Sequence, residues 1–550
     1  MKNNNRFRLD VWGTVTIGLI AIYALFLIYP MGHLIRASVY NENGQLSNEY
    51  FLKFFSKSYY FITLANSFKV SIAATVLSLA IGTPLAYFFT AYKIKGKKTL
   101  SILIVLASMS APFIGAYSWI LLLGRSGIVT LFFKKFGIVM PNIYGFGGIV
   151  LVMTLQLFPL VFLYARGALK NIDNSLIEAA ENLGCSGRKS FFKIVIPLIM
   201  PTLLAAGLLV FMRSFADFGT PMLIGEGFRT FPVVLYTEFI NEVGGSDGFA
   251  AAIAVIAIFI TTVVFLIQKY VSNKMAFSLN ALHPIMEKEP EKKNRFWIYL
   301  YSYLVVIVAI LPQCYVIYTS FKKTEGKVFK AGYSLASYET AFGKLGKSVQ
   351  NTLIIPFLAL IVILLLAVLI AYLAVRRRNS LTNLVDILSM IPYIVPGTVL
   401  GIALLTGFNK KPMLLSGTMS IMVIALIIRR LPYTIRSSVA ILQQIPMSIE
   451  EAAISLGASK MKAFFRVTVP MMRAGILSGA ILSWVTMISE LSTAVILYTG
   501  KTKTMTVATY TEVVRGNYGV AAALSAILTV LTVISLLAFN KINGGREMSM

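Results

Sequence analysis

Charged residues are scarce in this sequence. They make up 13% of its 550 positions, about half of the ~25% that is usual in soluble globular proteins. Hydrophobic residues make up 57%, the mean hydropathy is +0.77, and apolar runs of about 20 residues recur along the chain. The shortage of charge therefore excludes an ordinary soluble domain and indicates a polytopic membrane protein.

Cysteine and histidine are almost absent. The chain has two cysteines, Cys185 and Cys314, and two histidines, His33 and His283. These are too few for a Cys/His metal cage, and the two cysteines lie in surroundings too different to suggest a disulfide. We expect no tightly bound metal ion.

Acidic residues are also few, at 22 against 50 basic residues. A nucleic-acid-binding protein can carry such an excess. Here, however, many of the lysines and arginines lie in short loops between apolar runs, as the positive-inside rule requires of membrane proteins. We therefore expect a lipid bilayer, and no nucleic acid, as a partner of this chain.

Twelve apolar runs, six in each half of the chain, have the length of membrane spans. The first is too long for the core of a signal peptide and is not followed by a small-residue cleavage site, so we expect it to be retained. The predicted fold class is all-α, with about twelve transmembrane helices. The runs lie near residues 11–33, 62–92, 99–122, 146–168, 194–212, 249–271, 297–319, 350–375, 383–407, 416–434, 467–487 and 520–540.

Basic loops set the expected orientation. Four lysines between residues 93 and 98 follow the second run, and Arg376–Arg378 follow the eighth. Loops rich in Lys and Arg stay in the cytoplasm, so counting crossings places both termini of this cell-membrane protein inside. Lysines at 322, 323, 327 and 330, in a predicted outside loop, depart from the rule, which has less force for long loops.

The chain divides into two related halves, residues 1–272 and 296–550. The polar segment 273–295 between them is expected to be a cytoplasmic linker. Asn66 of the first half matches Asn351 of the second. Because an even number of spans leaves both halves the same way up, we predict parallel halves related by a pseudo-two-fold axis along the membrane normal.

The clearest repeat is a charged segment. Residues 176–197 and 449–470 are identical at ten of 22 positions. In both copies a serine precedes a glutamate by three residues, at Ser175–Glu178 and Ser448–Glu451. This spacing predicts a capping box at the start of a helix of two to three turns.

Each of these helices is expected to end at a glycine, Gly184 or Gly457, in the left-handed conformation. A single copy could be an amphipathic turn lying on lipid headgroups. Two copies at the same place in both halves favour instead a pair of docking sites for a two-fold symmetric partner. We place these sites in cytoplasmic loops 171–193 and 445–466.

The motif resembles the cytoplasmic loop signature of binding-protein-dependent ABC importer permeases. Glu-Ala-Ala, a glycine four positions later and a closing Val/Ile-x-Val/Ile-Pro occur in both copies. Residues 429–446, which precede the second copy, are similar to the fused ferric-iron transport permeases. The resemblance implies an importer permease that carries ferric iron, with aminoethylphosphonate, thiamine or another small solute as alternatives.

In that family this loop is a coupling helix that sits in a cleft of the ATP-hydrolysing subunit. The resemblance implies that two copies of an ABC ATPase bind here and hold the ATP and Mg, that this chain is not an enzyme and has no cofactor, and that an extracellular or periplasmic binding protein delivers the cargo. The implied docking residues are Glu178, Ala179, Ala180, Gly184, Glu451, Ala452, Ala453 and Gly457.

The fragment TGKT at Thr499–Thr502 is no phosphate-binding loop, because Val495 stands where that motif requires glycine. ATP hydrolysis in a separate subunit remains the expected energy source. Two other classes stay open. An ion-coupled secondary transporter would use membrane acids to carry protons, and a membrane scaffold would transport nothing. The doubled motif favours the importer.

Ionisable residues inside predicted spans mark a candidate path for the cargo, because charge in a membrane is costly. Glu490 and Asp217 occupy equivalent positions in the two halves, and this pair could line the path of a cation. Arg213, four residues before Asp217, could instead neutralise that acid locally. The sequence shows no ligand cluster dense enough to hold a bare metal ion tightly.

Arg429 and Arg430 follow only about 13 apolar residues, which is short for a crossing. Either they end the tenth span at the cytoplasmic surface, or the helix continues through Ile435 and they face the pore. In a pore they would favour an anionic cargo such as a phosphonate.

Overall fold

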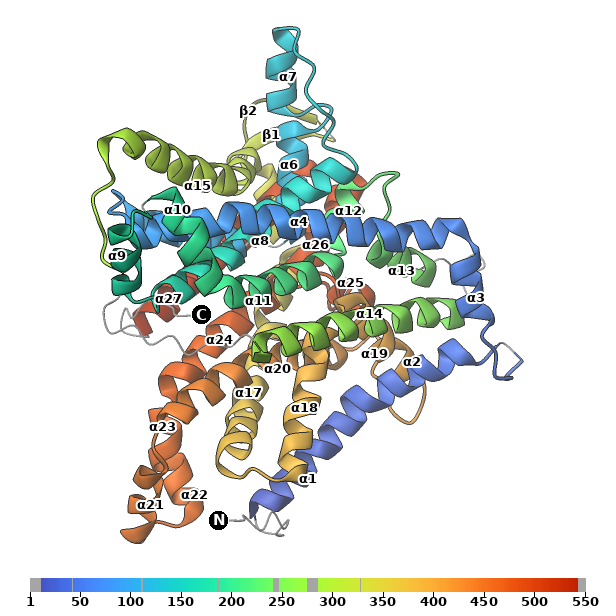
Figure 1. Ribbon diagram of the computed structural model, residues 1–550. Helices are drawn as coiled ribbons and strands as arrows, with labels where there is room; N and C mark the ends of the chain where they lie inside the picture. Colours follow the sequence, from blue (N-terminus) through green and yellow to red (C-terminus); the bar gives the residue numbers. More distant parts are fainter. Residues whose placement is uncertain are drawn as a thin grey trace. The chain divides into compact units, whose positions relative to one another are not determined.

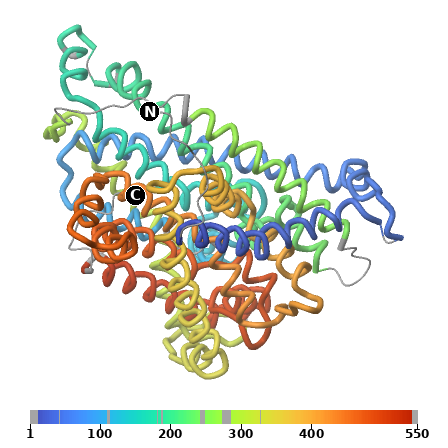
Figure 2. Tube along the Cα trace, turned by 90° about the horizontal axis from the view of Figure 1, so that it is seen from below, coloured from blue at the N-terminus to red at the C-terminus, as the bar shows by residue number. Residues whose placement is uncertain are grey.

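A computed structural model describes residues 11–41, 43–109, 112–185, 187–240, 247–274, 285–326 and 328–542. Helices dominate the Cα trace in Figure 2. The named strands of the described residues are β1 (Lys322–Glu325) and β2 (Val328–Tyr333), which pair antiparallel as a hairpin. The predicted all-α class is confirmed.

Helices of the first half run up to the linker (Figure 1). The linker residues 275–284, with His283, lie outside the described part of the chain. The helices are α1 (Val11–Tyr23), η1 (Ala24–Ile28), α2 (Tyr29–Val39), α3 (Glu49–Ser56), α4 (Ser58–Ala91), α5 (Lys97–Met109), α6 (Pro112–Leu123), α7 (Ile128–Lys135), α8 (Phe146–Leu169), α9 (Asn174–Asn182), α10 (Arg188–Ser190), η2 (Phe191–Val195), α11 (Ile196–Phe215), α12 (Gly219–Ile224), α13 (Phe231–Ile240) and α14 (Asp247–Lys274).

Helices of the second half repeat much of this order, with the β1–β2 hairpin after the first of them. They are α15 (Lys292–Ser320), α16 (Ala336–Phe342), α17 (Gly346–Arg376), α18 (Ser380–Ile394), α19 (Gly397–Gly407), α20 (Met419–Gln444), α21 (Met447–Ser455), α22 (Lys460–Ala463), η3 (Phe464–Thr468), α23 (Val469–Met471), α24 (Arg473–Ile488), α25 (Ala494–Leu497), α26 (Met505–Arg515) and α27 (Tyr518–Ile542).

Nine helical segments of the described residues are long and apolar enough to cross a membrane, and two bent helix pairs bring the number to as many as 11. The predicted twelve spans are therefore not confirmed as a count. Runs 383–407 and 467–487, each expected as one span, contain the bends, of 111° and 67°. Pro396 lies at the first bend, where a proline disfavours the helical conformation of the residue before it.

Three π-helical turns, η1, η2 and η3, each lie just ahead of a proline. The prolines are Pro30, Pro197 and Pro470, and each comes two residues after its turn ends. Proline has no backbone N–H, so the carbonyl four residues before it loses its α-helical partner. That carbonyl lies inside the π-turn in all three cases, and the wider turn accommodates the missing hydrogen bond.

The chain forms two compact units that do not follow the sequence halves. Unit 1 consists of the described parts of Met1–Phe51, Glu238–Ile258 and Ser320–Met548, and unit 2 of the described parts of Leu52–Thr237 and Phe259–Thr319. The first helices of the two halves are thus exchanged. Helices α1 and α2 pack on α18 and α19 within unit 1, and most of α15 belongs to unit 2.

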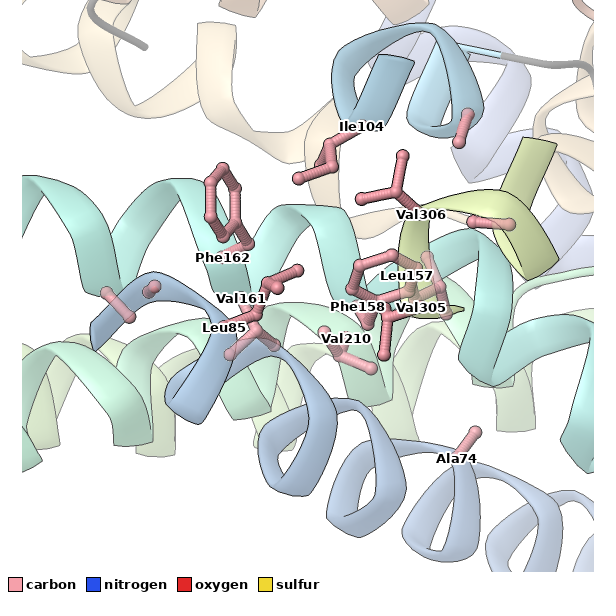
Figure 3. Packing of buried hydrophobic residues seen from close by; sticks show 14 of the residues in the cluster. Ala74, Leu85, Ile104, Leu157, Phe158, Val161, Phe162, Val210, Val305 and Val306 are labelled. Carbon is pink, nitrogen blue, oxygen red and sulfur yellow. The ribbon is translucent and has the colours of Figure 1, made fainter. Parts of the chain in front are cut away.

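The core of unit 2 is built where α4 packs on α8 and α11. Leu85, Val161, Phe158 and Val210 cluster between these helices in Figure 3. A Cβ atom at Gly82 of α4 would lie 2.8 Å from the carbonyl oxygen of Phe158. Small residues at helix contacts allow such close approach in membranes, where lipid is as apolar as the core and packing drives association.

In unit 1, α20 packs against α17 and α24. Small residues again allow close approach. A Cβ atom at Gly475 would lie 2.4 Å from Ile441 Cγ2, and the Ser437 hydroxyl donates to the Gly475 carbonyl at 2.7 Å. Thr434 and Ser483 hydroxyls are 2.9 Å apart across α20 and α24. A glycine and short hydroxyl side chains thus hold α20 and α24 in close contact.

The matching asparagines of the two halves make equivalent hydrogen bonds. Asn66 of α4 donates to the carbonyl of Arg229 at 3.0 Å in unit 2, and Asn351 of α17 donates to the carbonyls of Lys501 and Lys503 at 2.9 and 3.0 Å in unit 1. Each asparagine secures the loop that precedes α13 or α26. The repeat seen in the sequence is therefore also a repeat of local structure.

Candidate functional site

Each copy of the repeated segment forms a nine-residue helix, α9 or α21. The expected helix of two to three turns is therefore confirmed. The expected capping boxes are wrong, because Ser175 and Ser448 lie inside the first turn. The N–H of Ser175 donates to Asp173 Oδ1 at 3.0 Å, and Pro446, which precedes α21, makes no side-chain cap.

The glutamates of the motif consequently do not reach back to a serine. Glu178 accepts a hydrogen bond from Asn174 Nδ2 at 2.5 Å. Glu451 is exposed on α21. Both side chains lie on short helices at the surface of the described residues, where a partner protein could contact them.

The alanines that follow differ in exposure. Ala179 and Ala452 are exposed, Ala453 is half-buried and Ala180 is buried. A methyl side chain adds little bulk to an exposed helix face, so a second surface can approach the backbone closely. The two copies present this thin face in a similar way.

Both helices end as expected, at a glycine in the left-handed region. Gly184 has φ +78° and Gly457 has φ +90°. After the glycines, Cys185 N–H donates to the carbonyl of Ala180 and Ala458 N–H to that of Ala453, the six-residue closure typical of helix C-termini. These glycines therefore end the two helices.

Sequence reasoning missed two exposed leucines, Leu183 and Leu456, which stand directly before the glycines. Their exposed fractions are 87% and 90%, and Phe192 and Phe465 behind them are 67% and 59% exposed. Because they are exposed at matched positions beside the motif, Leu183 and Leu456 are further candidate contact residues. The signal was present in the sequence, since both pairs are identical across the two copies.

Helix α20 bears on the two interpretations of Arg429 and Arg430. It continues without interruption from Met419 to Gln444, and whether these arginines lie at the cytoplasmic end of a span or within it stays a prediction. The helix passes through Ile435, as the second interpretation expected. That the arginines face a pore stays a prediction.

Both arginines converge on Glu490, which follows α24. Arg430 donates to the Glu490 carboxylate, and Arg429 Nε lies 3.3 Å from Glu490 Oε2. Arg429 Nη1 also donates to Thr493 Oγ1 at 2.8 Å, and that hydroxyl donates to the Gly397 carbonyl at 3.1 Å. We call these five residues the arginine cluster.

Glycine is required at position 397 for this arrangement. A Cβ atom there would lie 1.5 Å from Arg429 Nη1, so the guanidinium group packs directly against the start of α19. Glu490 Oε1 accepts the N–H of Thr493 at 3.1 Å. Both carboxylate oxygens are therefore engaged. With two guanidinium groups and one carboxylate, the arginine cluster carries a net positive charge.

Asp217, the equivalent residue of unit 2, has a different environment. Its carboxylate accepts the N–H groups of Gly219 at 3.1 Å and Thr220 at 3.4 Å at the start of α12. The positions that correspond to Arg429 and Arg430 hold Gln156 and Leu157, which carry no charge. Asp217 therefore caps the start of a helix. That Asp217 and Glu490 face each other across a pore stays a prediction.

Two other expectations concern Arg213 and a metal site. Arg213 lies exposed in the last turn of α11. Within the described ranges, no three His, Cys, Asp or Glu side chains come together in a group that could hold a metal ion.

Comparison with known proteins identifies the family of the chain. Residues 74–277 and 363–543 match the family described as "binding-protein-dependent transport system inner membrane component". The chain belongs to this family. Each match contains one copy of the motif helix, α9 or α21, and neither contains the exchanged first helices α1–α2 and α15.

Relatives of the chain are permeases. A ferric transport system permease protein of Actinobacillus pleuropneumoniae is 28% identical over 96% of this chain and 78% of its own length. A putative ferric transport system permease protein of Haemophilus influenzae is 27% identical over 88% and 78%. A molybdenum transport system permease protein of Escherichia coli is 30% identical over 38% of this chain and 91% of its own.

The family assignment confirms the resemblance found in the sequence. The chain is a multi-pass membrane protein and the permease component of a binding-protein-dependent ABC transport system. It belongs to a family of membrane components rather than enzymes. The two copies of the family match agree with a fused, two-half permease.

Replacing Glu490 by glutamine should destabilise the protein strongly. The change leaves two half-buried guanidinium groups without the buried carboxylate that pairs with them, and breaking a buried ion pair on one side costs about 3–5 kcal/mol. We expect a clear drop in the midpoint of thermal unfolding of the purified protein in detergent. Glu325→Gln is the matched control, because Glu325 pairs with Lys330 at an exposed site, where such pairs contribute about 0–1 kcal/mol. Equal midpoints for the two variants would contradict the prediction.

Proposed function

We propose that this chain imports ferric iron, received from an extracellular binding protein and driven by ATP hydrolysis in two ATPase subunits docked on α9 and α21. The observation that carries the proposal is the pair of exposed, equally terminated helices 273 positions apart in the two halves. Two equal contacts are what a two-fold symmetric motor requires.

The docking surface consists of the motif residues and the leucines beside them. The exposed members, Glu178, Ala179, Glu451 and Ala452, lie on the helices, and Leu183 and Leu456 extend from their ends. Burying these exposed leucine side chains against a partner would lower the free energy of the complex. The ATPase subunits would hold the ATP and Mg, and this chain supplies the moving membrane path.

The proposed orientation places both termini in the cytoplasm. Lys93 N–H donates to the Lys288 carbonyl at 3.1 Å, and Lys97 pairs with Glu287 at 2.5 Å. The basic loop after α4 and the linker therefore lie on one side, the side that the positive-inside rule assigns to the cytoplasm. In unit 1 the β1–β2 hairpin and α21 lie at opposite ends (Figure 1), as an outside loop and a cytoplasmic helix should.

Ferric iron is the proposed cargo because the relatives that match almost the whole chain carry that name. A small oxyanion is the second candidate, supported by the net positive arginine cluster and by the molybdenum permease that matches part of the chain. Aminoethylphosphonate belongs to the same anionic class. Thiamine remains a third alternative from the family resemblance.

Substitution of Gly457 by valine should uncouple the permease from its ATPase. A residue other than glycine at φ +90° is strained by about 1–2 kcal/mol, enough to weaken a coupled contact roughly tenfold. The measurement is ATPase co-purification together with ATP hydrolysis stimulated by the loaded binding protein. Gly500→Ala is the control, since its Cβ would meet nothing within 4 Å. Normal coupling in Gly457→Val would count against the docking assignment.

Cysteine labelling tests the orientation. In a variant without Cys185 and Cys314, cysteines placed at Leu183 or Leu456 should resist a membrane-impermeant maleimide in intact cells and react after permeabilisation. A cysteine at Val139, which is 92% exposed in a predicted outside loop, should react in both conditions. Reaction of either leucine position from outside would place the docking helices on the wrong face.

Cargo identity is decided by reconstitution. Proteoliposomes with this chain, the ATPase and the binding protein should accumulate ferric iron only with ATP, and the binding protein should prefer ferric ion over molybdate, aminoethylphosphonate and thiamine. If the binding protein prefers an oxyanion, the ferric-iron proposal is wrong and the second candidate replaces it. Uptake that survives removal of the ATPase but stops when the proton gradient is collapsed would identify an ion-coupled transporter instead.

A further inference from the structure

Helix α21 carries a buried carboxylate that the repeated motif does not include. Glu450 is 4% exposed, although Glu451 beside it is exposed. The Tyr372 hydroxyl donates to the Glu450 carboxylate, and the Thr468 hydroxyl donates to its second oxygen at 3.3 Å. Arg376 Nε lies 3.9 Å from the same oxygen. Glu450 thus joins α21 to the inner end of α17 and to η3.

The partners of Glu450 are themselves held firmly. Arg376 Nη2 donates at 2.6 Å to the carbonyl of Ile445, the residue directly after α20. The Tyr372 ring packs against Trp12 and Phe464, with centroids 4.5 and 4.7 Å away, and Trp12 and Phe464 are 5.0 Å apart. The three buried rings connect α1, α17 and η3. We call these side chains, with Glu450, Thr468 and Arg376, the polar clamp.

The first copy keeps the aromatic contact and lacks the carboxylate. Tyr87 of α4, the counterpart of Tyr372, packs on Phe191 with a centroid distance of 4.7 Å. The position equivalent to Glu450 is Ile177, a buried apolar residue. At this one position α9 therefore has an apolar side chain, whereas α21 has a carboxylate that accepts directional, charge-assisted hydrogen bonds, which are roughly twice as strong as neutral ones.

We propose that Glu450 is a positioning residue that makes α21 move rigidly with α17 and α1, so that ATP-driven motion enters the membrane chiefly through the second half. This inference rests on the proposed function, in which α9 and α21 receive the ATPase. Helix α17 then conveys the motion across the membrane. At its other end Asn351 holds the Lys501 and Lys503 carbonyls, and Thr352 accepts the N–H of Met505.

That outer contact lies beside the arginine cluster. Helix α26 begins at Met505, and the Thr506 hydroxyl of its first turn donates to the backbone carbonyl of Glu490 at 2.8 Å. A displacement of α17 is therefore passed by hydrogen bonds to the segment that carries Glu490. The clamp, α17 and this segment form one connected set of contacts within unit 1.

The test uses the complete transporter with Glu450→Ile, which gives α21 the residue of the first copy. We expect the ATPase to co-purify as with the unchanged chain, and the cargo imported per ATP hydrolysed to fall about fivefold or more, the usual size of a coupling effect. Tyr372→Phe should lower the same ratio less. The double variant should be no worse than Glu450→Ile, because the hydrogen bond that Tyr372→Phe removes is already lost in Glu450→Ile.

The control is Ser535→Ala, which removes another hydrogen bond between helices of unit 1, from Trp484 Nε1 at 2.9 Å, and should leave the ratio unchanged. An unchanged ratio in Glu450→Ile, or an equal loss in the control, overturns the inference. If Glu450→Ile does not fold, Glu450→Gln decides. Its amide oxygen still accepts from Tyr372, but its amide nitrogen cannot accept from Thr468 and brings no negative charge to Arg376, so an unchanged ratio there also overturns the inference.

The proposed function fails separately, by a different outcome. If the unchanged chain neither binds an ATPase nor couples import to ATP hydrolysis, the proposed function is wrong. If the unchanged chain couples normally and the Glu450 variants couple equally well, only the clamp is wrong.

Discussion

Satisfaction of backbone hydrogen bonds in lipid is the constraint on which this structure depends. A bilayer interior offers no water to peptide N–H and C=O groups, so crossing segments must satisfy these groups internally, and helices do this within one segment. The described spans are accordingly helical, and departures occur at prolines such as Pro30 and Pro470, where a π-turn absorbs the missing donor. Polar and charged groups lie instead at helix ends or in pairs of side chains.

Close helix packing follows from the same environment. Lipid is as apolar as the side chains, so the hydrophobic effect does not drive helices together in a membrane. Helix association depends instead on dispersion forces and hydrogen bonds between helices. Gly82 and Gly475 bring backbones together, and hydroxyl pairs such as Thr434 with Ser483 join helices directly. A bundle packed in this way can carry a displacement from one end of its helices to the other.

The two halves share a plan but differ where charge is buried. Both end the repeated motif helix with a left-handed glycine, and both secure a loop with asparagine. Within the described residues, only the second half buries a carboxylate on its motif helix, at Glu450, and pairs Glu490 with two arginines. The two motif helices are therefore alike at their exposed faces and different in the contacts that support them.

The sequence alone determined the helical class, the doubled motif and its glycine stops, because hydropathy and left-handed glycines are local properties. It did not determine where the motif helices begin, since Asp173 and Pro446, rather than the serines, precede them. Only tertiary structure paired Glu490 with arginines some 60 positions away and buried Glu450 against Tyr372. Charge pairing across helices leaves no periodic signal in a chain, so it becomes visible only when distant segments meet.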